Sequence, residues 1–150
     1  MASTYSTSLK LELQATGENA GTWGDKTNTN LQLVEQAVGG YEEVSIAGGA
    51  GTTALTMSDG AASNARNMVV KLTGTITGNR IVTVPDSMEK VYIVSNGTTG
   101  SFTVQFKTAS GTGYTFVAAD KSVRVLFADG TNVVDTAVSY THLRAHETPV

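Results

Sequence analysis

The chain has 150 residues, enough to bury the core of one domain and to carry an appendage, and its lack of cysteine excludes a disulfide framework and a thiolate metal site. Charged residues make up 15% of the chain, the formal net charge is −3, and Lys and Arg form no cluster, so we expect no nucleic-acid partner. The sequence contains neither an apolar run long enough for membrane insertion nor an N-terminal signal segment.

The first residues, 1–16, are rich in Ser and Thr, and Leu9, Leu11 and Leu13 alternate with charged residues. This period of two predicts a short extended segment with one apolar edge, which would be able to pair with another chain. A loosely ordered terminus with leucines at chance positions is the alternative interpretation.

Residues 17–40 carry the clearest helix signal in the sequence. Thr29 and Gln32 stand at the spacing of a capping box, in which each side chain satisfies a free backbone N–H at the helix start. Gly39 and Gly40 then predict a left-handed stop. We therefore expect a helix of roughly ten residues, which is too short to be stable alone in water.

One apolar stripe runs down this predicted helix. Leu31, Val34 and Val38 follow each other at helical spacing, with Ala37 beside them. Since the helix cannot stand alone, the stripe must pack against its own β domain, against copies of the chain or against another protein.

The single tryptophan, Trp23, lies between Gly21 and Gly24, just before this stripe. An indole in a tight glycine turn beside a helix suits a buried packing anchor. Stacking on a sugar is the alternative role for this side chain.

From Tyr41 onward the sequence has short strand patterns separated by turn signals such as Asp129-Gly130, with roughly 8–12 residues between turns. This rhythm predicts a mainly β fold, with an antiparallel β-sandwich or barrel-like domain over residues 41–138, preceded by the short N-terminal helix and extended segment of residues 1–40. The predicted strands are Glu42–Ala47, Thr53–Met57, Asn67–Thr73, Arg80–Val84, Lys90–Ser95, Phe102–Thr108, Tyr114–Ala118, Ser122–Ala128 and Asn132–Thr136.

Three of these strands place apolar residues at every second position, and we expect those residues to face the core. They are Phe102, Val104 and Phe106; Met68, Val70 and Leu72; and Val123, Val125 and Phe127.

The last residues, 139–150, break this pattern. They hold both histidines, His142 and His146, and their sequence SYTHLRAHETPV resembles the translation of a sequencing adapter. We expect this segment to be a non-native, disordered tail and the natural protein to continue beyond it. Neither histidine therefore enters a mechanism.

Residues for catalysis are missing from the rest of the chain. Without the histidines no Ser-His or Cys-His pair can form, and the acidic residues follow no metal-loop spacing. Glu42 and Glu43 would point to opposite faces of a strand, so they cannot act as a glycosidase pair. We expect no enzyme activity, no metal and no cofactor.

The stretch Gly21-Thr22-Trp23-Gly24-Asp25, followed by Thr27-Asn28-Thr29-Asn30-Leu31 and Glu35, resembles the N-terminal motif of tail-fibre and tail-appendage proteins of tailed bacteriophages. The segments around Val84-Pro85-Asp86, Lys90–Asn96 and Asp129–Val134 are similar to the β module that follows in those proteins. The resemblance implies a homotrimer that attaches to the virion through its N-terminal region.

Carried over to this sequence, the resemblance implies an attachment or trimer-forming region, to which the apolar stripe adds two valines. The candidate residues are Trp23, Gly24, Thr27, Asn28, Asn30, Leu31, Val34 and Val38. The expected partners are copies of the chain and other phage tail proteins, with a host surface glycan bound through a distal region. The expected location is the virion, after synthesis in the host cytoplasm.

Two other functions are alternatives to this interpretation. A monomeric carbohydrate-binding β-sandwich would need a platform of exposed aromatic rings, for which Tyr92, Tyr114 and Phe116 are the candidates, although their alternation is more typical of a core. A polysaccharide-degrading tail enzyme would need paired acids, which the sequence does not place together.

Overall fold

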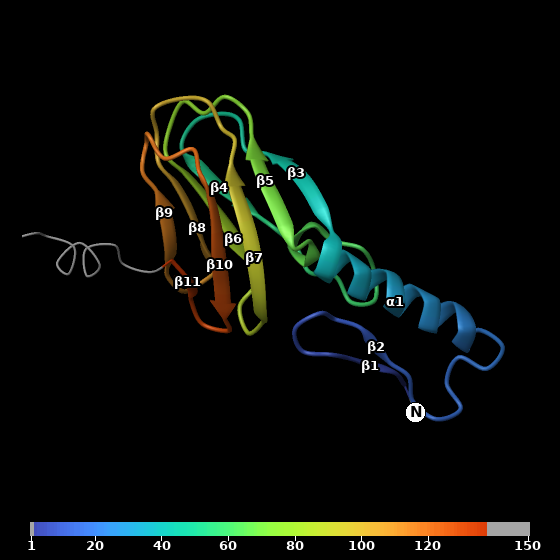
Figure 1. The fold of residues 1–150 in the computed structure, drawn as a ribbon. Coiled ribbons are helices and arrows are strands. Elements are labelled where there is room, and N and C mark those ends of the chain that lie inside the picture. The colour runs from blue at the N-terminus through green and yellow to red at the C-terminus, as the bar shows by residue number, and fades with distance from the viewer. Residues whose placement is uncertain (1, 138–150) are drawn as a thin grey trace, which may run out of the picture.

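The computed structural model describes residues 2–137, which form a hairpin and helix at one end and a larger β domain at the other (Figure 1). The hairpin consists of β1 (Thr4–Tyr5) and β2 (Glu12–Leu13), and α1 (Trp23–Gly39) follows it. The β domain contains the short 3-10 helix η1 (Asn64–Arg66) and the strands β3 (Tyr41–Ser45), β4 (Gly51–Ala54), β5 (Val69–Thr73), β6 (Arg80–Val84), β7 (Glu89–Asn96), β8 (Val104–Thr108), β9 (Gly113–Phe116), β10 (Val123–Asp129) and β11 (Val133–Asp135).

A mainly β domain behind an N-terminal helix was predicted, and the structure confirms it. Each predicted strand overlaps one of the strands β3 to β11. The predicted tail, residues 139–150, lies outside the described residues.

The antiparallel arrangement predicted for the domain is wrong for its central strands. One sheet has the order β11-β10-β7-β5-β3 and the other the order β4-β6-β8-β9. The pairs β3–β5, β5–β7, β4–β6 and β6–β8 are all parallel. Within the domain, antiparallel pairing is found where β9, β10 and β11 join their sheets.

The parallel strands arise because the chain winds back and forth between the two sheets. β3 and β4 form a first rung, β5 and β6 a second, and β7 and β8 a third, and each rung stacks on the one before. In the register, Tyr41 pairs with Val69, and Val69 pairs with Ile93. The domain is therefore a flattened coil of three rungs, closed at its last rung by the antiparallel strands (Figure 1).

The dipeptide Asn96-Gly97 illustrates why the pairing was misjudged. It has the sequence of a hairpin turn. In the structure Asn96 is buried, its amide donates to the carbonyl oxygen of Asp120 at 2.7 Å, and its Oδ1 accepts from the Thr98 hydroxyl at 2.7 Å. The chain therefore leaves β7 toward the opposite sheet instead of folding back beside it.

Glycine allows the rungs to stack closely at one corner of the coil. Gly100 has φ +114°, and a Cβ at this position would lie 2.3 Å from the carbonyl oxygen of Ile76 on the rung below. Any larger residue would meet both the backbone strain and the clash.

The core lies between the two sheets. Val70, Leu72 and Tyr92 enter it from the five-stranded sheet, and Val104 and Phe106 enter it from the other, all fully buried. The rings of Tyr92 and Phe106 meet edge to face, with their centroids 5.5 Å apart. This contact across the core fixes the two sheets against each other.

The predicted core face is right for some strands and wrong for others. Val70, Leu72, Val104 and Phe106 are buried as predicted. In contrast, Val123, Val125 and Phe127 of β10, together with Phe102, are exposed. β10 is apolar on both faces, and Leu126 and Ala128 occupy the core in place of their neighbours.

Candidate functional site

The helix α1 begins earlier than the sequence predicted. It starts at Trp23, directly after Gly21 with φ +81° and the N-cap residue Thr22, and it extends over 17 residues. Thr29 lies inside the helix, so the predicted capping box with Gln32 is wrong. A helix of this length is about 25 Å long.

The predicted left-handed stop at the end of α1 is also wrong. Gly40 has φ −70° and ψ 141°, so the chain continues from the helix directly into β3. Glycine is needed here for space, because a Cβ on Gly40 would lie 2.2 Å from the carbonyl oxygen of Gln36 and 2.5 Å from Oδ1 of Asn67.

The N-terminal segment is extended, as predicted, and its partner is the chain itself. Thr4 pairs with Leu13 and Tyr5 with Glu12 in the hairpin β1–β2. A hairpin of this size is not stable alone in water. It is held in place by α1 on one side and by the β domain on the other.

Asn30 joins the hairpin to α1. Its Oδ1 accepts from the backbone N–H of Glu12 at 2.9 Å, and its Nδ2 donates to the carbonyl oxygen of the same residue at 2.8 Å. The amide side chain thus pairs with the edge of β2 as another strand would. A residue with both a donor and an acceptor at this position is required for both bonds.

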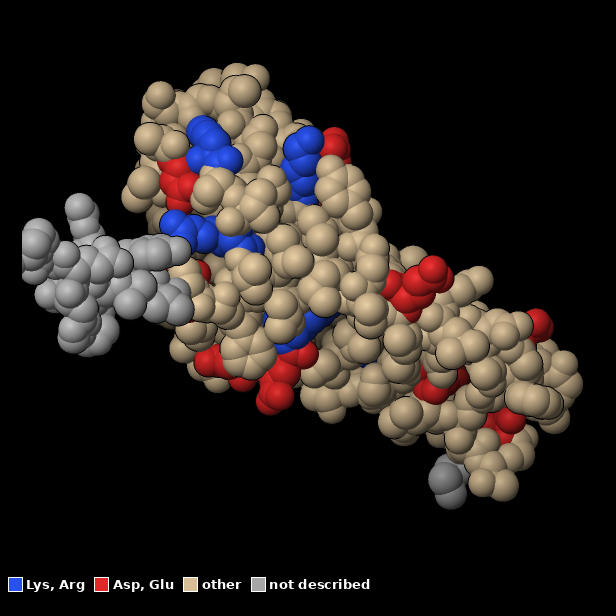
Figure 2. Space-filling view, in the orientation of Figure 1, with Lys and Arg blue, Asp and Glu red and all other residues tan. Residues whose placement is uncertain are grey.

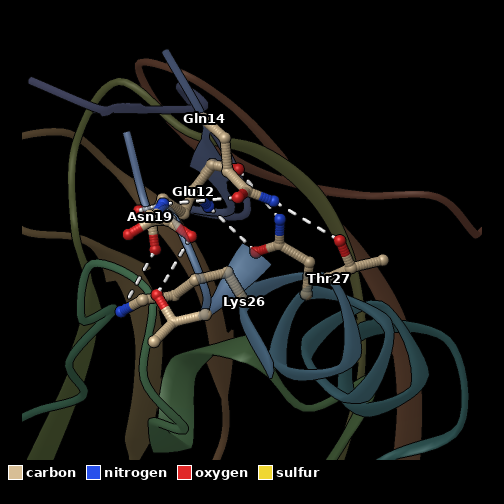
Figure 3. A network of polar contacts seen from close by, with 7 residues as sticks. Glu12, Gln14, Asn19, Lys26 and Thr27 are labelled. Atoms are coloured by element: carbon tan, nitrogen blue, oxygen red, sulfur yellow. Dashed lines mark hydrogen bonds and ion pairs between the residues drawn. The ribbon is translucent and has the colours of Figure 1, made fainter. Parts of the chain in front are cut away.

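The side chain of Glu12 organises a polar network on the same side of the helix (Figure 3). Its carboxylate accepts from Nδ2 of Asn19 at 2.8 Å and lies 3.5 Å from Nζ of Lys26. Asn19 also reaches Gln14, which donates to the Thr27 hydroxyl. The hydrogen bond from Asn19 is the main reason that the pKa of Glu12 lies below its usual value.

The tip of the hairpin is bound to the β domain through backbone groups. The guanidinium of Arg66, which is fully buried, donates from Nε to the carbonyl oxygen of Leu9 at 2.9 Å. The backbone N–H of Gly60 donates to the carbonyl oxygen of Lys10 at 2.8 Å. Hairpin, helix and β domain are therefore connected through Arg66, which also donates to Gln36 of α1.

The apolar stripe was expected to pack against the β domain, against copies of the chain or against another protein, and in the single chain it is exposed. Leu33 and Ala37 are the buried apolar residues of α1, whereas Leu31, Val34 and Val38 are 62%, 37% and 68% exposed. Trp23 is 65% exposed, so its predicted role as a buried anchor is wrong. The hairpin is bound to the face of α1 that carries Asn30, and the stripe lies beside that face.

The structure divides the candidate residues into two groups. Thr27 and Asn30 contact the hairpin, and Gly24 is half-buried near the helix start. Asn28 is exposed. Trp23 is exposed together with the three large residues of the stripe, and we call this set the α1 stripe: Trp23, Leu31, Val34 and Val38.

Sequence reasoning missed Glu12, Asn19 and Arg66 as parts of this site. They lie far from α1 along the chain or outside its apolar pattern, and their roles depend on the folded geometry. The period of two that ends at Leu13 was the one available signal, since it marks the strand to which Asn30 binds.

The described residues form none of the other sites that the sequence brought into question. Tyr92 and Phe116 are fully buried, and Tyr114 packs against Phe116, so they form no exposed platform for a sugar. Residues 2–137 contain no group of three His, Cys, Asp or Glu side chains placed to hold a metal ion. In this same range, no helix has the length and apolar character needed to cross a membrane.

Comparison of the chain with protein-family models, with curated proteins and with solved structures gave no match.

Proposed function

We propose that the chain is a structural subunit of a bacteriophage virion: the N-terminal attachment portion of a tail-fibre or tail-appendage protein that forms a homotrimer. In this role it links the tail to host-recognition modules, and its partners are copies of itself and other tail proteins. A distal region would contact a host glycan. The protein would be made in the host cytoplasm and incorporated into the virion.

The observation that carries this proposal is the exposed α1 stripe. Leu31, Val34 and Val38 follow each other at spacings of three and four residues, which is the pattern of a coiled-coil seam. Exposing four large apolar side chains along one helix is unfavourable unless a partner covers them. Three identical helices around a threefold axis would bury all of these seams at once.

The hairpin supports this role because it stabilises the helix before assembly. Asn30 and Leu33 fix one side of α1, so the orientation of the stripe is set within each chain. The motif residues Thr27 and Asn30 therefore hold α1 in place through the hairpin. The apolar residues of the α1 stripe form the surface that packs against the other subunits. Less conformational entropy is lost on association when the surface is already ordered.

The test is the mass of the full chain in solution, measured by light scattering on a sizing column. We expect a trimer for the unaltered chain and dissociation for Leu31→Lys, which places a charge in the seam. Gln32→Lys is the matched control, because Gln32 is an exposed neighbour on the same helix outside the stripe. It should remain a trimer.

Two results would contradict the proposal. One is an unaltered chain that stays monomeric at high micromolar concentration. The other is equal behaviour of Leu31→Lys and Gln32→Lys, since a trimer that tolerates a charge in the stripe does not assemble through it. Circular dichroism of each variant establishes that the fold is retained.

A further inference from the structure

The outer face of the five-stranded sheet is a second large apolar surface of the described residues, beside the α1 stripe. In its register, Val125 of β10 lies beside Ile93 of β7, Ile93 beside Val69 of β5, and Val69 beside Tyr41 of β3. One apolar row therefore crosses four strands. Phe127 extends the surface as the neighbour of both Val91 and Val134.

Polar residues border this outer sheet face at both ends. On one side the next row begins with Val123 and continues with Ser95, Lys71 and Glu43, in which the Lys71 ammonium lies 3.1 Å from the Glu43 carboxylate. On the other side Asp129 pairs with Glu89. Figure 2 shows a broad uncharged area over β7 and β5, with a basic group beside it over β10 and other charged side chains at its margins. An apolar centre with a polar rim is the anatomy of a protein interface.

The surface is as large as the apolar patches through which monomeric proteins often bind partners. Six of its side chains are between 37% and 59% exposed, namely Tyr41, Val91, Val123, Val125, Phe127 and Val134. Together they expose roughly 500 Å², which is near the upper end of the largest patch on a typical monomer. The α1 stripe adds roughly 400 Å², so the total of roughly 900 Å² is comparable to the 800 Å² or so that each partner buries in a standard interface.

We propose that the outer sheet face packs against other copies of this chain, so that the β domain as well as α1 takes part in the homotrimer. This inference rests on the proposed function. The two surfaces meet in the chain at the end of α1, where Val38 is followed by Tyr41, the last member of the apolar row. A surface with no charge in its centre can face an identical copy without burying an unpaired ion.

The experiment compares Val125→Lys with Val117→Lys in the full chain, by sedimentation velocity over a range of concentrations. Both valines are exposed, at 45% and 61%, but Val117 follows β9 in the opposite sheet. We expect a single chain to fold normally with either lysine, because the valine at each position already contacts water. We expect the dissociation constant to rise about tenfold or more for Val125→Lys and to stay unchanged for Val117→Lys.

A second measurement reports on proximity without disrupting the interface. Since the chain has no cysteine, Val125→Cys and Val117→Cys each provide one unique site for a spin label. Labels at position 125 should be much closer to one another between subunits than labels at position 117.

The outcomes separate this inference from the proposed function. If Leu31→Lys dissociates the trimer while Val125→Lys and Val117→Lys both leave it intact, the sheet inference is overturned and the proposed function stands. Distances at position 125 as long as those at position 117 would overturn it in the same way. A monomeric unaltered chain overturns both.

Discussion

Lys90 places a cation at the inner face of β7. Its side chain is buried, Nζ donates to the carbonyl oxygens of Asn67 and Val91 at 3.0 Å each, and Nζ lies 4.2 Å from the centre of the Tyr92 ring. Burial disfavours the charged form and lowers the pKa of Lys90 to about 8. The carbonyl groups and the ring compensate for part of the lost hydration.

This burial predicts a distinct dependence of stability on pH. An unfolded lysine has a pKa of about 10.4, so between about pH 8 and pH 10 the unfolded chain binds more protons than the folded one. The free energy of unfolding should therefore rise by about 1–3 kcal/mol across this window. Urea unfolding at several pH values measures it. Burial raises the pKa of Tyr92, so this phenol stays neutral throughout the same range.

Lys90→Met is the control for this prediction. Methionine fits a similar volume and does not titrate, so the variant should lose the rise between pH 8 and pH 10. If the free energy of unfolding changes equally with pH in the two proteins, the titration of Lys90 does not cause the rise.

Among the buried polar residues, we expect replacement of Arg66 to cause the largest loss of stability. Its guanidinium donates to the carbonyl oxygens of Leu9, Ser58 and Ala61 and to two side chains, and burial lowers its pKa. Arg66→Met leaves these acceptors without partners, which should reduce the free energy of unfolding by about 3 kcal/mol or more. Arg66→Lys should recover only part of this loss, because an ammonium lacks the planar fork.

Urea unfolding and hydrogen exchange check the role of Arg66. In the lysine variant the amide of Gly60, which donates to Lys10 on the hairpin, should exchange faster than in the unaltered chain. Exchange at an unchanged rate, together with full stability, would show that Arg66 does not hold the hairpin.

At the scale of elements, Asn30 predicts that the hairpin can be released from α1 by changing one atom. Asn30→Asp keeps the shape of the side chain but replaces the donor to the Glu12 carbonyl with a second carboxylate oxygen. Because the new carboxylate oxygen repels the Glu12 carbonyl oxygen, the hairpin should move away from α1. We then expect the Glu12 amide to lose protection in hydrogen exchange and residues 6–20 to become sensitive to protease, while the β domain melts as before. Asn28→Asp, an exposed change of the same charge on the same helix, should have neither effect.

The strands could be predicted from sequence because each is a local pattern, but their pairing could not. Phe106 and Val104 alternate with polar residues, so the strand and its inner face are evident from the chain alone. The parallel neighbours β6 and β8 are separated by a whole strand in the other sheet. No turn residue marks such a pair, and turn signals between strands led instead to an antiparallel prediction.

The sequence does not reveal which face of α1 or of β10 points inward, and the physical reason is similar for both elements. Val125 and Leu126 are neighbours with similar hydrophobicity, so the pattern of β10 fits either face. In α1 the apolar stripe was identified, but the polar side chain of Asn30 decides which side faces inward. Hydrophobic patterning cannot detect a hydrogen bond to a strand 18 residues away in the chain.

At the scale of the whole molecule, the distribution of charge predicts how assembly responds to salt. The α1 stripe and the centre of the outer sheet face are apolar, whereas each chain carries a formal net charge of −3. Like-charged chains repel weakly, and salt screens this repulsion while leaving apolar contacts intact. Raising sodium chloride from about 0.05 to 0.5 M should therefore leave the dissociation constant of the trimer unchanged or lower it. Sedimentation velocity at several salt concentrations measures this, and a constant that rises steeply with salt would indicate an interface made of ion pairs in place of the two apolar faces.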